Sequence, residues 1–309
     1  MSLTLTRYPG NPLLVPSPLN AWETDNVFNA AMARHNGLIY MHYRAQGLDR
    51  ISRIGCAISS DGYHFNRLLE PVLAPANEFE AFGVEDPRIT ELDGVFYMLY
   101  TAYSPQGTRV SLARSTNLIA WERLGVVLPD EDNKDAALFP EKIGGRYAMF
   151  HRRPPDIWLA YSDDLLHWTD HQIIMQPRPG QWDSVRVGAG GPVFKTEWGW
   201  LNIYHGYNED RVYCLGVALH DLDDPARILK RQDEPVLCPL GPFEQWGDVP
   251  NVVFTCGGIE SEDAYHIYYG GGDHVMAVAS VSKADVRAFA QGLPESADGR
   301  ASVGNGAGC

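Results

Sequence analysis

Apolar residues along the chain occur in short runs that come in pairs. Most runs alternate apolar with polar positions and are rich in Val, Ile, Tyr and Phe, which is typical of β-strands. A polar or glycine-containing turn separates the two runs of a pair. Each pair therefore predicts a β-hairpin, and the five predicted hairpins are 38–43 with 53–59, 95–103 with 109–115, 146–151 with 157–162, 200–206 with 212–219 and 264–270 with 275–281.

The five hairpins recur at intervals of 51 to 64 residues. Units of this length suit four-stranded blades that stack around an axis, because one such unit cannot bury its faces alone. We therefore predict an all-β fold, a single-domain five-bladed β-propeller over residues 1–292. A β-sandwich is the alternative, but its strands rarely recur so evenly. A short helix is predicted over 283–292, and the polar, Gly-rich stretch 293–309 is predicted to be a disordered tail.

Composition agrees with a turn-rich β protein and excludes several functions. The chain has 309 residues, with 30 Gly, 21 Pro, 8 Trp, 15 Tyr and 11 Phe. Its formal net charge of −14 argues against nucleic-acid binding, which needs a basic surface. No signal peptide or membrane-spanning run is visible, so we expect a cytoplasmic protein without a membrane partner. The scattered cysteines are expected to be free thiols, and their spacing predicts no metal site; they are Cys56, Cys214, Cys238, Cys256 and Cys309.

Polar residues recur near the ends of the predicted strands. In a propeller the innermost strand of each blade ends near the axis, and we expect the first strand of each hairpin to be innermost. Residues at its ends, and in the loop before it, would then converge in a central funnel. The residues at such positions are Asn29, Arg44, Asp86, Arg88, Lys134, Arg152, Arg186, His205, Asp248 and Asp273.

Two groups in this set suggest chemistry. Asp86, within the segment GVEDPRIT, is a candidate general acid, although Asp-Pro is also a common turn opener and Asp86 could simply pair with Arg88. The basic residues of the set could together hold a doubly charged anion such as phosphate, and they are Lys134, Arg152, Arg186 and His205.

The sequence resembles glycoside hydrolase family 130, the β-mannoside phosphorylases and related β-mannosidases, over roughly residues 8–290. The motifs that carry the resemblance are FNAA (28–31), SRIG (52–55), AISSDG (57–62), GVEDPRIT (83–90), KDAALFPEKI (134–143), FHR (150–152), GAGGP (188–192), YHG (204–206) and GDVPNVVF (247–254). The resemblance implies a five-bladed β-propeller. The family most often has Arg at the position of Lys134 and Lys at the position of Arg186, so the positive charge is kept at both. The segment GAGGPV departs from a more Pro-rich form.

The resemblance also implies roles for the recurring residues. Asp86 matches the general acid, and Asn29, Arg44 and Asp248 match residues that hold the mannosyl unit. Lys134, Arg152, Arg186 and His205 match phosphate-binding positions. We expect Arg88, Tyr103, Tyr207 and Asp273 to contact the substrate as well, with the tyrosines stacking on an acceptor sugar.

These roles imply inverting phosphorolysis of nonreducing-end β-mannosides to α-mannose 1-phosphate, with phosphate as co-substrate and with no metal or organic cofactor. β-1,4-Mannooligosaccharides are the favoured substrates, and β-1,2-mannosides, mannosyl-glucose and mannosyl-N-acetylglucosamine stay open. Two other functions stay open as well: a β-mannosidase that uses water, and a non-catalytic propeller that binds carbohydrate or protein. A homo-oligomer is possible.

Overall fold

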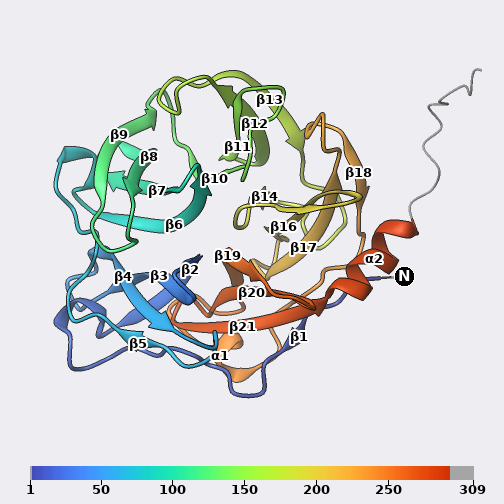
Figure 1. Ribbon diagram of the computed structural model, residues 1–309. Helices are drawn as coiled ribbons and strands as arrows, with labels where there is room; N and C mark the ends of the chain where they lie inside the picture. Colours follow the sequence, from blue (N-terminus) through green and yellow to red (C-terminus); the bar gives the residue numbers. More distant parts are fainter. Residues whose placement is uncertain (1, 293–309) are drawn as a thin grey trace, which may run out of the picture.

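The computed structural model describes residues 2–292, and most of them lie in β-strands. Figure 1 shows these strands in sheets placed around a common centre, an arrangement like that of a β-propeller. The described residues include two short α-helices, α1 (Pro242–Gln245) and α2 (Lys283–Gln291), and two 3-10 turns, η1 (Ala21–Glu23) and η2 (Glu78–Glu80). The predicted all-β class is confirmed, whereas the predicted tail 293–309 lies outside the described residues.

The described strands form four hydrogen-bonded sheets. Their orders are β1-β21-β20-β19, β10-β11-β12-β13, β14-β16-β17-β18 with β15 also on β16, and β2-β3-β4-β6-β7-β8-β9 with β5 also on β4. The strands are β1 Thr6–Arg7, β2 Asn26–His35, β3 Leu38–Gln46, β4 Ser52–Ser59, β5 Asn66–Arg67, β6 Gly83–Leu92, β7 Val95–Ser104, β8 Gly107–Ser115, β9 Glu122–Leu128, β10 Lys134–Leu138, β11 Tyr147–Arg153, β12 Asp156–Ser162, β13 Thr169–Met175, β14 Arg186–Gly188, β15 Phe194–Thr196, β16 Gly199–Tyr207, β17 Tyr213–His220, β18 Ile228–Arg231, β19 Val253–Glu260, β20 Ala264–Gly271 and β21 Val275–Ser282.

The largest sheet consists of two antiparallel arrays, β2 to β5 and β6 to β9. They are joined by one parallel bridge between Ser52 of β4 and Gly83 of β6. At the other side of the molecule, β1 near the N-terminus pairs with β21 near the C-terminus, with Thr6 opposite Ser280. The two ends of the described chain therefore share one sheet.

All five predicted hairpins are confirmed, but they are not where we expected them within the sheets. They are the antiparallel pairs β3–β4, β7–β8, β11–β12, β16–β17 and β20–β21. In each case an earlier strand lies nearer the centre: β2, β6, β10, β14 and β19 (Figure 1). The prediction that the first hairpin strand is innermost was therefore wrong. These inner strands are short or irregular, so no alternating pattern marks them.

The hydrophobic core lies between neighbouring sheets. Leu201 and Val217 of one sheet, for example, belong to one buried cluster with Ile267 and Ala279 of the next. Helix α2 adds Phe289 to the same cluster. The Ser282 side chain begins this helix by accepting a hydrogen bond from the backbone N–H of Asp285. The predicted helix 283–292 is therefore confirmed to within one residue.

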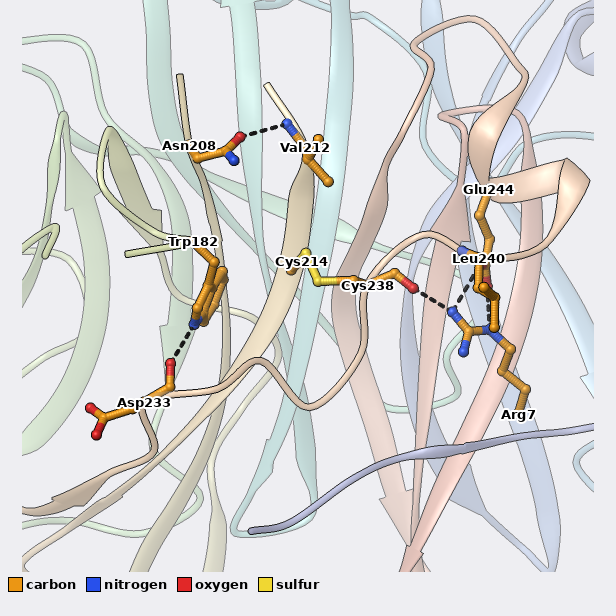
Figure 2. Close-up of a disulfide and its surroundings, with 9 residues drawn as sticks. All are labelled: Arg7, Trp182, Asn208, Val212, Cys214, Asp233, Cys238, Leu240 and Glu244. Carbon is orange, nitrogen blue, oxygen red and sulfur yellow. Dashed lines mark hydrogen bonds and ion pairs between the residues drawn. A yellow bond between two sulfur atoms is a disulfide. The ribbon is translucent and has the colours of Figure 1, made fainter. Parts of the chain in front are cut away.

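Two of the cysteines are joined, contrary to the expectation of free thiols. Cys214, in β17, forms a disulfide with Cys238, and their Cα atoms are 4.4 Å apart (Figure 2). The Cys238 carbonyl accepts a hydrogen bond from Arg7, which also pairs with Glu244 of α1. The spacing of the cysteines in the sequence could not reveal this disulfide. Cys214 lies in a strand and Cys238 in a loop, and only the fold brings them together. Cys56 and Cys256 are buried free thiols.

No helix within residues 2–292 combines the length and the apolar character that crossing a membrane requires.

Candidate active site

A cavity of about 220 Å³ lies where the inner strands meet. Its walls come from every sheet, and the lining residues are Asn29, Arg44, Asp86, Lys134, Asp135, Arg152, Arg186, Tyr213, Val249, Val252, Phe254 and Asp273. Seven of the predicted site residues are therefore brought together: Asn29, Arg44, Asp86, Lys134, Arg152, Arg186 and Asp273. The other five lie behind this wall or on other surfaces.

Three polar side chains of this site sit on equivalent irregularities of the inner strands. The pairing register shifts around Asn29 in β2, Asp86 in β6 and Asp135 in β10, as it does at a β-bulge. Their φ angles are 50°, 49° and 53°, in the left-handed region that Asn and Asp tolerate better than most residues. A bulge re-aims a side chain, and all three of these residues line the cavity.

Asp86 is almost fully buried, and its contacts are cationic or hydrogen-bond donors. Its Oδ1 accepts hydrogen bonds from Asn29 Nδ2 at 3.0 Å and from Arg44 Nη1 at 3.3 Å. Burial alone would raise the pKa of Asp86, but the charges of Arg44, Arg88 and Lys134 outweigh it, and the net pKa is lowered. Asp86 is therefore a carboxylate in the unliganded site.

Asp273 is a second carboxyl at the cavity, in the turn between β20 and β21. Burial, aided by the negative charges of Asp86 and Asp248, raises its pKa to about 7, although Arg44 and Lys134 oppose the shift. Two carboxyl groups of the same cavity thus differ in their affinity for a proton, which is common at catalytic sites.

Besides Arg44, three cationic side chains line the cavity, and much of their hydrogen-bonding capacity is unused. Neither Lys134 nor Arg186 makes an ion pair with any described residue, although the Arg186 guanidinium lies 5.5 Å from the centre of the Tyr207 ring. The buried Nε atoms of Arg152 and Arg186 have no hydrogen-bond partner within residues 2–292. Buried donors without acceptors are costly. A polyanion in the cavity would satisfy them.

His205 does not add a fourth positive charge. It is fully buried behind the cavity wall, against Phe254, with ring centres 4.0 Å apart. Burial lowers the pKa of His205 to about 4, against the opposing effect of Asp135. At neutral pH the imidazole is therefore uncharged, which corrects the expectation of a basic residue at this position.

Arg88 lies beneath the cavity and does not line it. Its Nε donates to the Gly190 carbonyl at 3.0 Å, its Nη1 to the Asp86 carbonyl at 2.8 Å, and its Nη2 to Asp135 Oδ1 at 3.1 Å. Because these donors are used within the protein, Arg88 holds the strands that carry Asp86 and Asp135. Arg88 therefore does not line the cavity as a substrate contact, which corrects our expectation for this residue.

The remaining predicted residues lie outside the first cavity. Asp248 accepts two hydrogen bonds from Arg50, at 3.0 and 2.8 Å, on the exposed rim. Tyr103 is 39% exposed and lies edge-on to Phe82. Tyr207 faces Tyr213, with ring centres 4.5 Å apart.

A second cavity, of about 590 Å³, adjoins the first. Its lining residues are Arg186, Tyr207, Asp210, Arg211, Tyr213, Val249, Pro250 and Asn251. It shares Arg186, Tyr213 and Val249 with the first cavity. The second cavity adds the rings of Tyr207 and Tyr213 to the site, and it also contains charged groups, among them Asp210 and Arg211.

The site also contains residues that the sequence analysis did not select. Asp135 lies at the bulge of β10, and aligning the inner strands on Asn29 and Asp86 would have found it. Tyr213 and Phe254 gave no such signal, because aromatic residues are frequent along the whole chain. No group of three or more His, Cys, Asp or Glu residues within residues 2–292 is arranged to hold a metal ion.

Comparison with known protein families shows to which family the chain belongs. The sequence model of the family described as β-1,4-mannooligosaccharide phosphorylase matches residues 6–291. The chain belongs to glycoside hydrolase family 130. Since the match spans nearly all of the described residues, every inner strand and both cavities lie within it.

Within family 130, the chain is similar to several phosphorylases. It is 48% identical to a 1,2-β-oligomannan phosphorylase of Thermoanaerobacter sp. (strain X514), over 92% of this chain and 99% of the relative. It is 45% identical to a β-1,2-mannobiose phosphorylase of the same organism, with the same coverage. Among solved structures, β-1,2-mannobiose phosphorylase from Listeria innocua superposes with a TM-score of 0.87 at 32% identity, covering 94% of this chain and 99% of that one.

Proposed function

We propose that the protein is an inverting β-mannoside phosphorylase that releases α-mannose 1-phosphate. The observation that carries this proposal is the first cavity, where the buried carboxyl of Asp86 faces cations with unused donors. An inverting hydrolase needs a second carboxylate as base to activate water. Phosphate is already a nucleophile, so a cationic cradle can take the place of that base. Lys134, Arg152 and Arg186 supply the cradle.

In the proposed reaction a phosphate oxygen attacks C1 of the mannosyl unit as the bond from C1 to the glycosidic oxygen breaks. The leaving oxygen takes a proton from Asp86, directly or through the mannosyl 3-hydroxyl. Asn29 and Arg44, which contact Asp86, would hold the mannosyl unit beside it. The products are α-mannose 1-phosphate and a saccharide shorter by one unit.

The acid role requires Asp86 to gain a proton when the substrates bind. In the unliganded cavity the nearby cations keep its pKa low. A bound phosphate dianion would offset those cations and raise the pKa of Asp86 toward neutrality. Phosphate binding would thus prepare the acid as well as supply the nucleophile.

We propose β-1,2-linked mannosides as substrates in place of the β-1,4-linked ones expected from sequence. The supporting observation is that the two Thermoanaerobacter relatives, at 48% and 45% identity, are both named for β-1,2-mannosides. The description of the matching family names β-1,4-mannooligosaccharides, which makes them the alternative. The acceptor sugar would occupy the second cavity, where Tyr207 and Tyr213 offer ring faces for stacking.

We also propose that the sheets form five blades of one domain, residues 1–292. The supporting observation is that the 8-stranded sheet divides at its single parallel bridge into two antiparallel arrays. With the other three sheets this makes five units, each with its own inner strand.

Hydrolysis is a second candidate, favoured by Asp273. A carboxyl with a pKa of about 7 could accept a proton from water at neutral pH. One assay separates the candidates: incubate the protein with β-1,2-mannobiose or β-1,4-mannobiose, with and without phosphate, and quantify mannose and mannose 1-phosphate. Phosphate-dependent mannose 1-phosphate supports the proposal. Free mannose without phosphate indicates a hydrolase, and no turnover of any mannoside indicates a binding protein.

A further inference from the structure

Asp135 is a carboxylate in the wall of a cavity proposed to bind an anion, which by charge alone is unfavourable. Its side chain is fully buried, yet it contacts three of the groups around the site. Its Oδ1 accepts from Arg88 at 3.1 Å, and its Oδ2 lies 2.8 Å from Arg152 Nη1 and 3.2 Å from His205 Nε2. Burial would raise the pKa of Asp135, but Arg152 and Arg88 hold it well below its usual range.

Two features of the backbone aim Asp135 at these partners. The bulge in β10 places it at a φ of 53°. Gly188 of β14 leaves the space for the contact, because a Cβ there would lie 2.6 Å from Asp135 Oδ2 and would also clash with His205 Nε2. Such a contact, built from three strands, fixes where the Arg152 guanidinium can lie.

We propose that Asp135 is a positioning residue for the phosphate site, which orients Arg152 so that its remaining donors face the phosphate. This inference rests on the proposed phosphorolysis. One Arg152 nitrogen is held by Asp135, while its buried Nε has no partner within the described chain. His205, on the other side of Asp135, lies behind the cavity wall and limits the movement of the carboxylate. Arg152 thus retains donors for a ligand while Asp135 restricts its movement.

A positioning role and a purely electrostatic role of Asp135 predict opposite changes in phosphate affinity when Asp135 is replaced by Asn. If Asp135 acted through its charge, Asp135→Asn would remove a repulsion and tighten phosphate binding. If it positions Arg152, the asparagine presents an N–H₂ group to one of the two arginines, and the cradle loses its geometry. We then expect the KM for phosphate, and the Kd for inorganic phosphate from calorimetry, to rise about tenfold or more. The KM for the mannoside should stay within about twofold, because that end of the cavity is unchanged.

Glu23→Gln is the matched control. Glu23 is also a fully buried carboxylate paired with an arginine, Arg67, and neither residue lines either cavity. This variant should lose stability without a change in the KM for phosphate. A second test variant, Gly188→Ala, leaves every charge in place but pushes Asp135 and His205 aside, and it should raise the KM for phosphate as well.

Each result decides the question. An unchanged or lower KM for phosphate in a folded Asp135→Asn protein would overturn the proposal. If that variant does not fold, Gly188→Ala decides in the same way, and if neither folds, Asp135 is a structural residue and the proposal is wrong. If wild-type turnover does not depend on phosphate, the proposed function fails first, and the wild-type assay alone reveals it.

Discussion

At the scale of single residues, the charge of the first cavity depends on the protonation of two carboxyl groups, Asp86 and Asp273. Asp86 is held as a carboxylate by Arg44, Arg88 and Lys134, whereas burial raises the pKa of Asp273 in the same cavity to about 7. The sequence could place both carboxyls near the axis from their repeat positions. It could not assign their proton affinities, because these depend on burial and on cations contributed by other strands.

The first prediction concerns the acid. Asp86→Asn keeps the hydrogen-bond acceptor for Asn29 and Arg44 but has no proton to give to the leaving oxygen. We expect kcat to fall by about 10²- to 10⁴-fold, the usual contribution of a general acid. Phosphorolysis rates on mannobiose measure the effect, and a thermal melt checks the fold. If the variant kept more than about a tenth of wild-type kcat, the acid would have to be another group.

The second prediction concerns Asp273 and stability. Its folded-state pKa of about 7 lies above the usual 3.8, so the folded protein holds this proton more tightly than the unfolded chain does. The stability linked to this group is therefore fully present below about pH 4 and is lost as the pH rises through 7. Asp273→Asn removes the cost of burying the ionised carboxylate. At pH 8 this variant should be more stable than the wild type by about 2 kcal/mol, which is about half of the free energy that the full pKa shift corresponds to, because solvent in the cavity screens the charge.

Thermal melts of wild type and Asp273→Asn between about pH 4 and pH 8, a range that spans both pKa values, measure this effect. The difference in Tm should be small near pH 4, grow as the pH rises, and level off above about pH 7. A difference that is independent of pH would mean that Asp273 is ionised throughout.

At the scale of elements, the inner strands were the hardest part to predict. The hairpins behind them are recognisable as apolar runs rich in β-branched and aromatic residues, because both faces of those strands are largely buried. The inner strands β2, β6 and β10 break the alternation at Asn29, Asp86 and Asp135, where a left-handed residue turns the chain. The same bulges that hid these strands from a pattern-based prediction bring the polar side chains to the cavity.

Glycine marks where inner segments touch. A Cβ at Gly257 of β19 would lie 2.8 Å from the Met32 backbone N and 3.0 Å from the Ala31 Cα, both in β2. A Cβ at Gly191 would lie 2.6 Å from the Cα of Gly257. The repeat analysis could not foresee these contacts, since they depend on how closely adjacent sheets approach.

The third prediction follows from this contact. Gly257→Ala places a methyl group against backbone atoms that cannot rotate away, and it should destabilise the protein by about 1–3 kcal/mol. Denaturant unfolding measures the loss. Gly292→Ala is the control, because a Cβ there meets no atom closer than 3.4 Å, and it should change stability little. Equal effects at the two positions would show that backbone entropy, and not the β2–β19 contact, sets the cost.

At the scale of the whole molecule, neighbouring sheets are joined by side chains and by a covalent bond as well as by their core. Arg7 of β1 pairs with Glu244 of α1, whose carboxylate also accepts from Tyr269 of β20. The disulfide extends this set of contacts from Cys238 to Cys214 of β17, in the preceding sheet (Figure 2). The segment 236–245 is thus bound to two neighbouring sheets, to one through the disulfide and to the other through the ion pair between Arg7 and Glu244.

The last prediction tests the covalent part of this connection. The Cys214–Cys238 bond closes a loop with a sequence separation of 24 residues. Restricting a loop of that length in the unfolded chain stabilises the fold by about 3 kcal/mol. The double variant Cys214→Ser/Cys238→Ser should therefore have a lower Tm than the oxidised wild type, and a reducing agent should lower the wild-type Tm toward it. The same agent should leave the double variant unchanged. Thiol alkylation of the denatured protein should count two more reactive cysteines after reduction than before. If the count did not change, the bond would be absent in solution, and the two sheets would depend on Arg7, Glu244 and the apolar core alone.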